Sequence, residues 1–259
     1  MQKRNTQQRR RSIIERLNSH GEVMVDQLAE LFSTSEVTIR KDLTELENSG
    51  LLLRKFGGAV LLPKGSSELS NENVSSQKIA IAKAAANLIK DHNRIIIDSG
   101  STTSALLPLL KYKIGLVVMT NSLHVASNLL EQENEPTVLM SGGTWDTQSH
   151  SFQGKMAEQM LRAYNFDQAF LGAAGLDLDK GTTTFNELTQ LSKVMAEVSS
   201  QVIVMAESEK LQRKIPNVEL PWGDISVLVT DDQISTEARQ KIEKYGVEII
   251  CATTNNTGA

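Results

Sequence analysis

The residues of this sequence best suited to chemistry are small hydroxyl, amide and glycine residues that directly follow short apolar runs. One such loop follows residues 94–97, and two more end the runs before residues 120 and 141. Hydroxyl groups and free backbone N–H groups at such turns can bind a phosphate, although Ser and Thr also cap helices without any ligand. Because the three loops repeat one pattern, we expect them to form one phosphate-binding crevice, made by Asp98, Ser99, Gly100, Ser101, Thr102, Thr103, Thr120, Asn121, Ser141, Gly142 and Gly143.

A second group of residues has the chemistry of DNA recognition. The stretch VDQLAELFSTSEVTIRKDLT has the apolar spacing of two short helices joined by a turn, as in a helix-turn-helix. Arg side chains can bind guanine in the major groove, and Ser or Thr can bind bases or phosphates. We expect the second helix and a following basic hairpin to contact DNA through Ser35, Glu36, Thr38, Arg40, Lys41, Arg54 and Lys55, with help from Arg9 to Arg11. A small three-helix bundle with a charged surface is the alternative.

The elements that must position these residues fall into two domains. Helices are expected over residues 7–17, 25–32 and 35–48, with Ser35 as an N-cap and Gly21 as a C-cap, followed by a hairpin over 51–62. Residues 1–62 would form a winged helix-turn-helix domain and the Ser-rich residues 63–76 a linker. From residue 77 to 259, short apolar strands alternate with helices, which predicts an α/β domain with a parallel sheet and a ligand at the carboxyl ends of its strands.

Composition and charge agree with this division. The chain of 259 residues has a net charge of −4, but its first 55 residues hold ten Lys or Arg against eight acidic residues, and the remainder holds 17 against 23. A basic head therefore precedes an acidic body. One cysteine excludes an internal disulfide framework, the four histidines lack the spacing of a metal site, and no apolar run reaches the length of a membrane span. We expect a cytoplasmic protein with no cofactor and no membrane partner.

The stretch TSEVTIRKDLTELENSGLLLRKFGGAVL resembles the signature of the DeoR family of bacterial sugar-operon regulators. The matching residues are Ser35, Thr38, Ile39, Arg40, Lys41, Asp42, Leu43, Leu46, Glu47, Gly50, Arg54, Gly57 and Gly58. Within the family, DSGSTTSALLPLL, VVMTNSLHVASNL, SGGTW and TTTFNE are most similar to the glucitol (sorbitol) operon repressors. The resemblance implies a C-terminal effector domain similar to ribose-5-phosphate isomerase, which binds a phosphorylated sugar and assembles the chain into a dimer or tetramer.

The same resemblance raises an alternative, a sugar-phosphate isomerase with a DNA-binding head. The isomerases carry an acid in a Gly-Ala-Asp-Glu stretch, whereas this chain has Ala174 there, and Asp177 and Glu187 match the remaining carboxylates only loosely. Lys210 resembles the lysine of the family's Asp-Ser-x-Lys segment and is expected to pair with a charged effector. The sequence thus predicts a repressor of a sugar or sugar-alcohol operon, relieved by a phosphorylated sugar such as glucitol 6-phosphate, and no enzyme.

Overall fold

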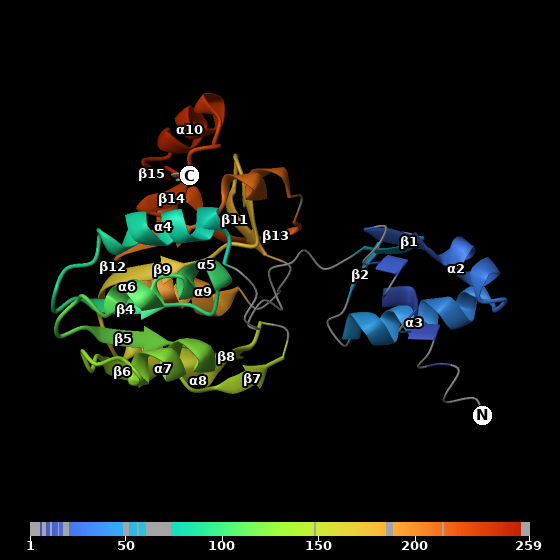
Figure 1. Cartoon of the computed structure of the whole chain (residues 1–259), viewed down its shortest axis with the longest axis horizontal. Helices are drawn as coiled ribbons and strands as arrows, with labels where there is room; N and C mark the ends of the chain where they lie inside the picture. Colours follow the sequence, from blue (N-terminus) through green and yellow to red (C-terminus); the bar gives the residue numbers. More distant parts are fainter. Residues whose placement is uncertain are drawn as a thin grey trace, which may run out of the picture. The chain divides into compact units, whose positions relative to one another are not determined.

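The computed structural model divides the chain into two compact units, Met1–Ser67 and Glu68–Ala259, and each is described here by itself (Figure 1). The structure describes Thr6, Arg9, Arg10, residues 12–14, Arg16, Leu17, and residues 21–48, 52–55, 57–60, 74–147, 149–184, 189–213 and 215–254. Gly50 and Glu187, and most of the predicted linker (residues 63–73), lie outside these residues.

The first unit is a helix-turn-helix with a small antiparallel sheet. Its described residues between Thr6 and Leu17 are helical, and Gly21, with φ +76°, donates its N–H to the Leu17 carbonyl as a C-cap. The elements that follow are β1 (Glu22–Met24), α2 (Val25–Leu31), α3 (Glu36–Asn48), β2 (Leu53–Lys55) and β3 (Gly58–Val60). The strands pair in the order β1-β3-β2. The predicted winged helix-turn-helix is confirmed, with β1 as an element that the sequence did not reveal.

The core of this unit shows why the three helices form. Ile13 and Leu17 from the first helix pack with Leu28 of α2 and with Ile39 and Leu43 of α3, and all five side chains are buried. β3 lies so close to β1 that a Cβ atom on Gly58 would stand 2.1 Å from the Val23 carbonyl oxygen. A glycine is therefore required where the hairpin crosses β1.

The second unit is built on a seven-stranded sheet in the order β15-β14-β12-β9-β4-β5-β6. Every neighbouring pair in it is parallel. The strands are β4 (Arg94–Ile97), β5 (Val117–Thr120), β6 (Thr137–Met140), β9 (Phe166–Leu171), β12 (Ser199–Met205), β14 (Val227–Asp231) and β15 (Glu248–Ala252). This is the parallel α/β fold that the alternation of apolar runs predicts.

Helices cover both faces of this sheet. Successive residues of β4 point to opposite faces, so Ile95 and Ile97 pack with α4 (Ser76–Ala86), α6 (Leu107–Leu110) and α7 (Leu123–Leu130). Ile96 packs in the other core with α8 (Lys155–Arg162), α9 (Gln190–Glu197) and α10 (Thr236–Glu243). From the sequence, a single helix is predicted over residues 104–110, and this prediction is wrong in its extent. The chain forms the four-residue α5 (Ser101–Ser104) and then α6, whose first turn holds Pro108, a residue that has no N–H to continue a helix.

Several smaller elements were not predicted. β7 (Thr144–Asp146) and β8 (Ser151–Gln153) form a hairpin, and β10 (Gly175–Asp177), β11 (Gly181–Thr184) and β13 (Asn217–Pro221) form a second, antiparallel sheet. Two 3-10 helices, η1 (Ser208–Gln212) and η2 (Trp222–Asp224), follow β12 and β13. Among the described residues, no helix is long and apolar enough to cross a membrane.

Candidate nucleic-acid interface and anion site

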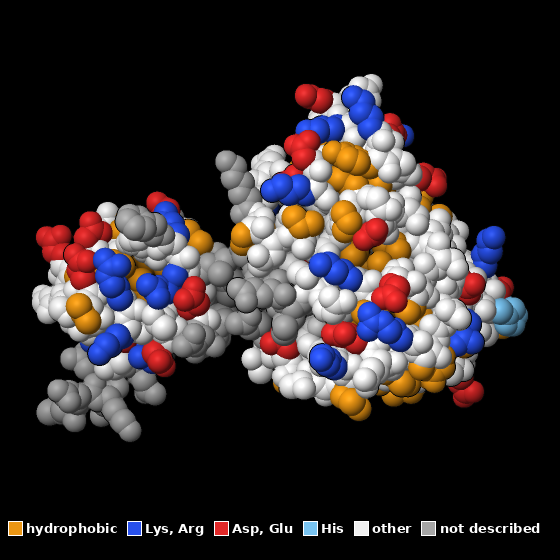
Figure 2. All heavy atoms as spheres, turned by 180° about the vertical axis from the view of Figure 1, so that it is seen from behind, with side chains coloured by type: hydrophobic (Ala, Val, Ile, Leu, Met, Phe, Trp, Pro, Cys, Tyr) orange, Lys and Arg blue, Asp and Glu red, His pale blue; other side chains and the backbone are white. Residues whose placement is uncertain are grey.

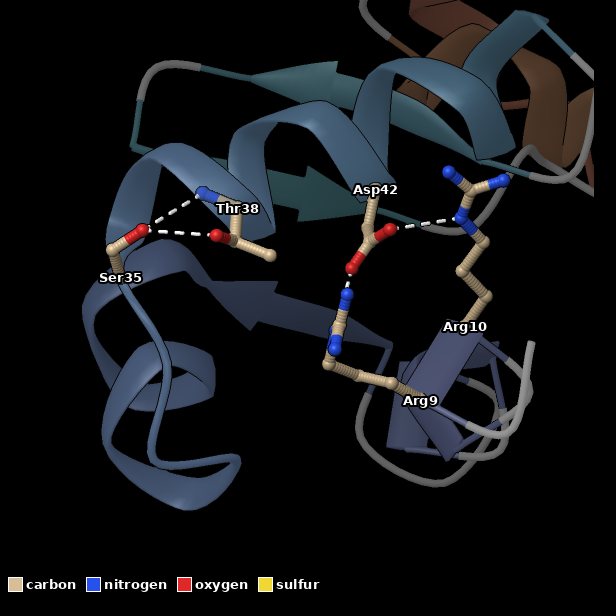
Figure 3. Close-up of polar contacts among 5 residues, drawn as sticks. All are labelled: Arg9, Arg10, Ser35, Thr38 and Asp42. Atoms are coloured by element: carbon tan, nitrogen blue, oxygen red, sulfur yellow. Dashed lines mark hydrogen bonds and ion pairs between the residues drawn. The ribbon is translucent and has the colours of Figure 1, made fainter. Parts of the chain in front are cut away.

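The start of α3 is fixed by a hydrogen-bonded cap. The Ser35 Oγ accepts the backbone N–H of Thr38 at 3.2 Å and shares a 2.9 Å hydrogen bond with the Thr38 hydroxyl (Figure 3). The predicted N-cap is thus confirmed. Both hydroxyls are engaged within the turn, so their role at a DNA surface is first to hold this end of the helix.

The predicted DNA-contacting residues of α3 share the exposed side of the helix. Ser35, Glu36, Arg40 and Lys41 are exposed, and Thr38 is half-buried. The Arg40 Nη2 lies 3.0 Å from the Glu36 Oε2, with 49% and 53% of the two side chains exposed. An exposed pair of this kind contributes at most about 1 kcal/mol, so Arg40 can exchange Glu36 for a base or a phosphate at little cost.

The two basic residues of the hairpin are exposed but not unpaired. The Arg54 backbone N–H donates to Glu47 of α3, and its Nη1 donates to the Thr44 hydroxyl, both at 3.0 Å. Lys55 forms an ion pair with Glu22 of β1. On the face of this unit shown in Figure 2, basic and acidic side chains lie interspersed, without a single basic patch. DNA phosphates would therefore have to compete with acidic neighbours for these cations.

Two arginines expected at the DNA backbone have another role. Asp42 of α3 is 2% exposed, and its carboxylate oxygens accept from the Arg9 Nε at 2.6 Å and the Arg10 Nε at 2.8 Å (Figure 3). The two guanidinium groups thereby fasten the first helix to α3. From the sequence, Arg9 and Arg10 are expected to contact DNA, because the pattern does not reveal that the buried Asp42 carboxylate binds both side chains. Arg11 lies outside the described residues.

In the second unit, strand order brings the predicted loops to one edge. The chain passes from β4 to β5 and β6 on one side, then returns to β9 and β12 on the other side of β4. The direction therefore reverses between β4 and β9, and a reversal of this kind is where open α/β sheets bind ligands, beyond the carboxyl ends of the strands. The loops after β9, β4, β5 and β6 are consecutive along that edge.

Asp98 joins the two loops at this reversal. One carboxylate oxygen accepts from the Gly100 N–H at 2.9 Å and the Thr103 hydroxyl at 2.7 Å, and the other accepts from the Gly172 N–H at 2.7 Å. Burial raises the pKa of Asp98, although these hydrogen bonds oppose the rise. The loops approach so closely that a Cβ atom on Gly100 would stand 3.6 Å from the Gly172 Cα. Since three donors occupy the carboxylate, a direct contact of Asp98 with an effector stays a prediction.

The other predicted loop residues differ in their exposure and in the hydrogen bonds that they already form. Thr102 and Thr103 are buried, whereas Ser99, Gly100 and Ser101 are half-buried. The Thr120 hydroxyl accepts the Ser122 N–H at 3.1 Å, and the Ser141 hydroxyl donates to the Gly142 carbonyl at 3.2 Å. Gly142 and Gly143 both have positive φ.

Asn121 differs from these residues in having a buried polar atom without a partner among the described residues. It is 3% exposed, and its Oδ1 has no hydrogen-bond partner in the described structure. A buried acceptor without a donor is costly, so this oxygen suits a hydroxyl group of a ligand.

Lys210 reaches the same edge from η1. Its Nζ donates to the Ala173 carbonyl at 2.8 Å. Burial lowers the pKa of Lys210 to about 8, opposed by the charge of Glu207 and assisted by the charges of Arg213 and Lys78. Arg213 also donates to the Ala174 carbonyl, at 3.3 Å. Two cations thus bind the backbone of one loop, and Arg213 is also ion-paired with Glu209.

Asp231, at the end of β14, positions this cluster. Its carboxylate accepts from the Ser208 N–H at 2.8 Å and the Ser208 hydroxyl at 2.6 Å, and so holds η1 and Lys210 in place. Sequence reasoning missed Lys78, Arg213 and Asp231. Only Asp231 carried a signal, because it is a polar residue at the end of an apolar strand.

Asp177 is the last residue of β10, the strand that follows the loop at Ala174. Its carboxylate accepts hydrogen bonds from the N–H groups of Asp179 and Lys180, at 2.9 and 3.1 Å, in the turn after β10. Together with a hydrogen bond to Asp179, its charge raises the pKa of Lys241 of α10. Glu187 lies outside the described residues, so both assignments to the effector site stay predictions. Among the described side chains, no three His, Cys, Asp or Glu residues gather as metal ligands.

Comparison with known proteins supplies the family. Residues 9–64 match the model of the DeoR-like helix-turn-helix domain, and residues 73–232 match that of the DeoR C terminal sensor domain. The chain belongs to the DeoR family. This DeoR-family chain is 38% identical over 252 residues to the putative aga operon transcriptional repressor of Escherichia coli O157:H7, covering 95% of this chain and 93% of that one. It is also 31% identical to the transcriptional repressor AccR of Agrobacterium fabrum, covering 95% and 98% of the two chains.

These relatives are named as regulators, and the DeoR-family chain is accordingly a transcriptional regulator with a DNA-binding head and a sensor domain, not an enzyme. Among solved structures, a D-ribose-5-phosphate isomerase in complex with phospho-erythronic acid is 18% identical, with a TM-score of 0.40 over 54% of this chain and 55% of the isomerase.

Proposed function

We propose that this DeoR-family regulator represses a sugar or sugar-alcohol operon and is released from its operator by a phosphorylated sugar, with glucitol 6-phosphate as the first candidate. The observation that carries the proposal is that Lys210 and Arg213 donate to the carbonyls of Ala173 and Ala174 in the loop after β9, at the reversal of strand order, while the charge of Lys78 also acts on Lys210. A phosphate there would be bound by these cations and by the N–H and hydroxyl groups of the half-buried Ser99 and Ser101. The Asn121 Oδ1 would accept a hydroxyl of the sugar.

The DNA-binding residues of the proposal are those of α3 and the hairpin: Ser35, Glu36, Thr38, Arg40, Lys41, Arg54 and Lys55. A single recognition helix reads one half-site, and operators are commonly bound by symmetric pairs. The regulator therefore works as a homo-oligomer, a dimer or a tetramer, in the cytoplasm where its operator lies.

The domain boundaries are part of the proposal, with a head over residues 1–62, a linker over 63–76 and an effector and oligomerisation domain over 77–259. Limited proteolysis with mass spectrometry checks it, since cleavage should concentrate within 63–76. If the first proteolytic cleavages occurred within residues 77–259 instead, the proposed domain boundary would be wrong.

A hydrogen bond offers a route from the effector to the linker. Ser75 caps α4, its Oγ accepting the Lys78 N–H at 3.2 Å, and it donates to Glu207 at 2.9 Å. Glu207 and Lys78 both act on the pKa of Lys210. An anion that binds Lys210 would therefore change the charges around Ser75, which lies at the end of the linker and caps α4. Release from DNA requires that the effector bind two states with different affinities, and we propose that the contact of Ser75 with Glu207 differs between those states.

Gel-shift or anisotropy measurements with the promoter DNA beside its own gene test the proposal. Glucitol 6-phosphate should weaken binding at least tenfold, whereas glucitol and inorganic phosphate at equal concentration should not. A panel of other hexose and amino-sugar phosphates identifies the effector if glucitol 6-phosphate fails. Absence of specific binding at moderate salt, or no response to any sugar phosphate, contradicts the proposal.

A further inference from the structure

Val37 is an exposed apolar residue in the first turn of α3. Its side chain is 62% exposed, whereas the other apolar residues of α3, Ile39, Leu43 and Leu46, are buried in the core. Because positions i, i+3, i+4 and i+7 share one face of a helix, Val37 lies on the face of Arg40, Lys41 and Thr44. Core packing therefore does not account for a valine at this position.

Helix stability does not account for it either. A β-branched residue is a weaker helix former than alanine, lysine or glutamate, and at 62% exposure Val37 gains little buried surface in return. The polar residues beside it are engaged with one another, Ser35 with Thr38 and Glu36 with Arg40. Val37 therefore presents two methyl groups at the end of the helix that enters the major groove in this motif.

In the major groove, the C5-methyl group of thymine is the one apolar group that a base pair displays. We propose that Val37 is a specificity-determining residue that contacts the C5-methyl group of an operator thymine. The inference rests on the proposed reading of DNA by α3. The valine suits this contact because its side chain has essentially one rotamer in a helix, so little conformational entropy is lost on binding.

The test replaces each thymine of the footprinted promoter duplex in turn by deoxyuridine, which lacks only the methyl group. Full-length wild type, Val37→Ala and Leu31→Ala are compared by fluorescence anisotropy. Leu31 of α2, 49% exposed, is the matched control for loss of an exposed apolar side chain. One replacement per half-site should weaken wild type and Leu31→Ala about fourfold, the fold-change expected for burial of one methyl group. The same replacement should leave Val37→Ala unchanged.

Two results would overturn the inference: wild-type binding indifferent to every replacement, or Val37→Ala as sensitive as wild type at each thymine. Specific binding with either result leaves the proposed function intact. A wild-type protein without specific binding removes the proposed function and this inference together.

Discussion

Charged groups are used in opposite ways by the two units of this regulator. In the head, Arg40, Glu36, Lys55 and Glu22 form exposed pairs that cost little to break. In the effector unit, Asp98 and Lys210 are held in surroundings that shift their pKa values, and both are tied to loop backbone. The exposed ion pairs of the head can be exchanged for DNA contacts with small rearrangements, whereas Lys210 is buried and, like Asp98, is held by the backbone of neighbouring loops.

Asp42 is the exception within the head, since it is the buried charge on which two helices depend. Asp42→Ala should destabilise the head by about 3 kcal/mol, because two partly buried guanidinium groups lose their carboxylate. Hydrogen exchange of peptides from the head, measured across the thermal unfolding transition, gives this loss of stability. Glu45→Ala, which removes an exposed carboxylate of the same helix 3.8 Å from Arg10, should stay within about 0.5 kcal/mol of wild type. Equal effects of the two changes would refute a special role for Asp42.

Lys210→Met should abolish the response to the effector and stabilise the empty effector unit. The pKa of Lys210 falls from 10.5 to about 8 on folding, so the charged amine costs at most about 3 kcal/mol below pH 8. Between pH 8 and 10.5 the unfolded chain binds more protons, and wild-type stability should therefore rise with pH in that window, unlike that of the variant.

Melting temperatures across this window and effector titrations check the Lys210 prediction, with the exposed Lys180→Met as the control. Effector affinity should also decrease as pH rises through about 8, because the ammonium group is lost. A Lys210→Met protein with wild-type effector response would contradict the assigned role.

Arg40→Ala should weaken specific operator binding by about 1 to 3 kcal/mol if the side chain reads a base, and should leave effector binding unchanged. Anisotropy titrations at several salt concentrations measure it, with Lys244→Ala removing one exposed positive charge from the other unit. If only the salt slope changes, Arg40 contacts a phosphate and the base-reading role is wrong.

Glu219 of β13 is another ionisable group of the effector unit with a shifted pKa. Burial raises the pKa of Glu219 to about 7, opposed by a 2.6 Å hydrogen bond from the Ser192 hydroxyl and assisted by the charge of Asp98. The folded chain therefore binds more protons than the unfolded chain between pH 4.5 and 7, and stability should fall as pH rises through that window. Glu219→Gln should flatten this part of the profile of melting temperature against pH, and the exposed Glu248→Gln should not.

Local sequence pattern predicted the elements whose periodicity is strong. Ile39, Leu43 and Leu46 recur at helical spacing after a capping Ser35, and the run over residues 95–97 is apolar throughout, as expected of a strand covered on both faces. The sheet of β10, β11 and β13 was missed because Gly181–Thr184 reads Gly-Thr-Thr-Thr, without alternating hydrophobicity.

Long-range partners were beyond local reasoning. Lys78 of α4 acts on Lys210 although the two residues are far apart in the sequence, and Arg213, only three residues after Lys210, reaches the carbonyl of Ala174, 39 residues away. Arg9 and Arg10 looked like solvated charge because their partner, Asp42, is 32 to 33 residues away.

The difference between the two units is tested most directly by DNA titrations of wild type and Lys210→Met, each with increasing glucitol 6-phosphate or the effector found by the panel. The account predicts equal operator affinity for the two proteins without effector, and at least a tenfold loss with effector for wild type alone. A variant that is released as readily as wild type, or one that fails to bind the operator at all, would contradict it.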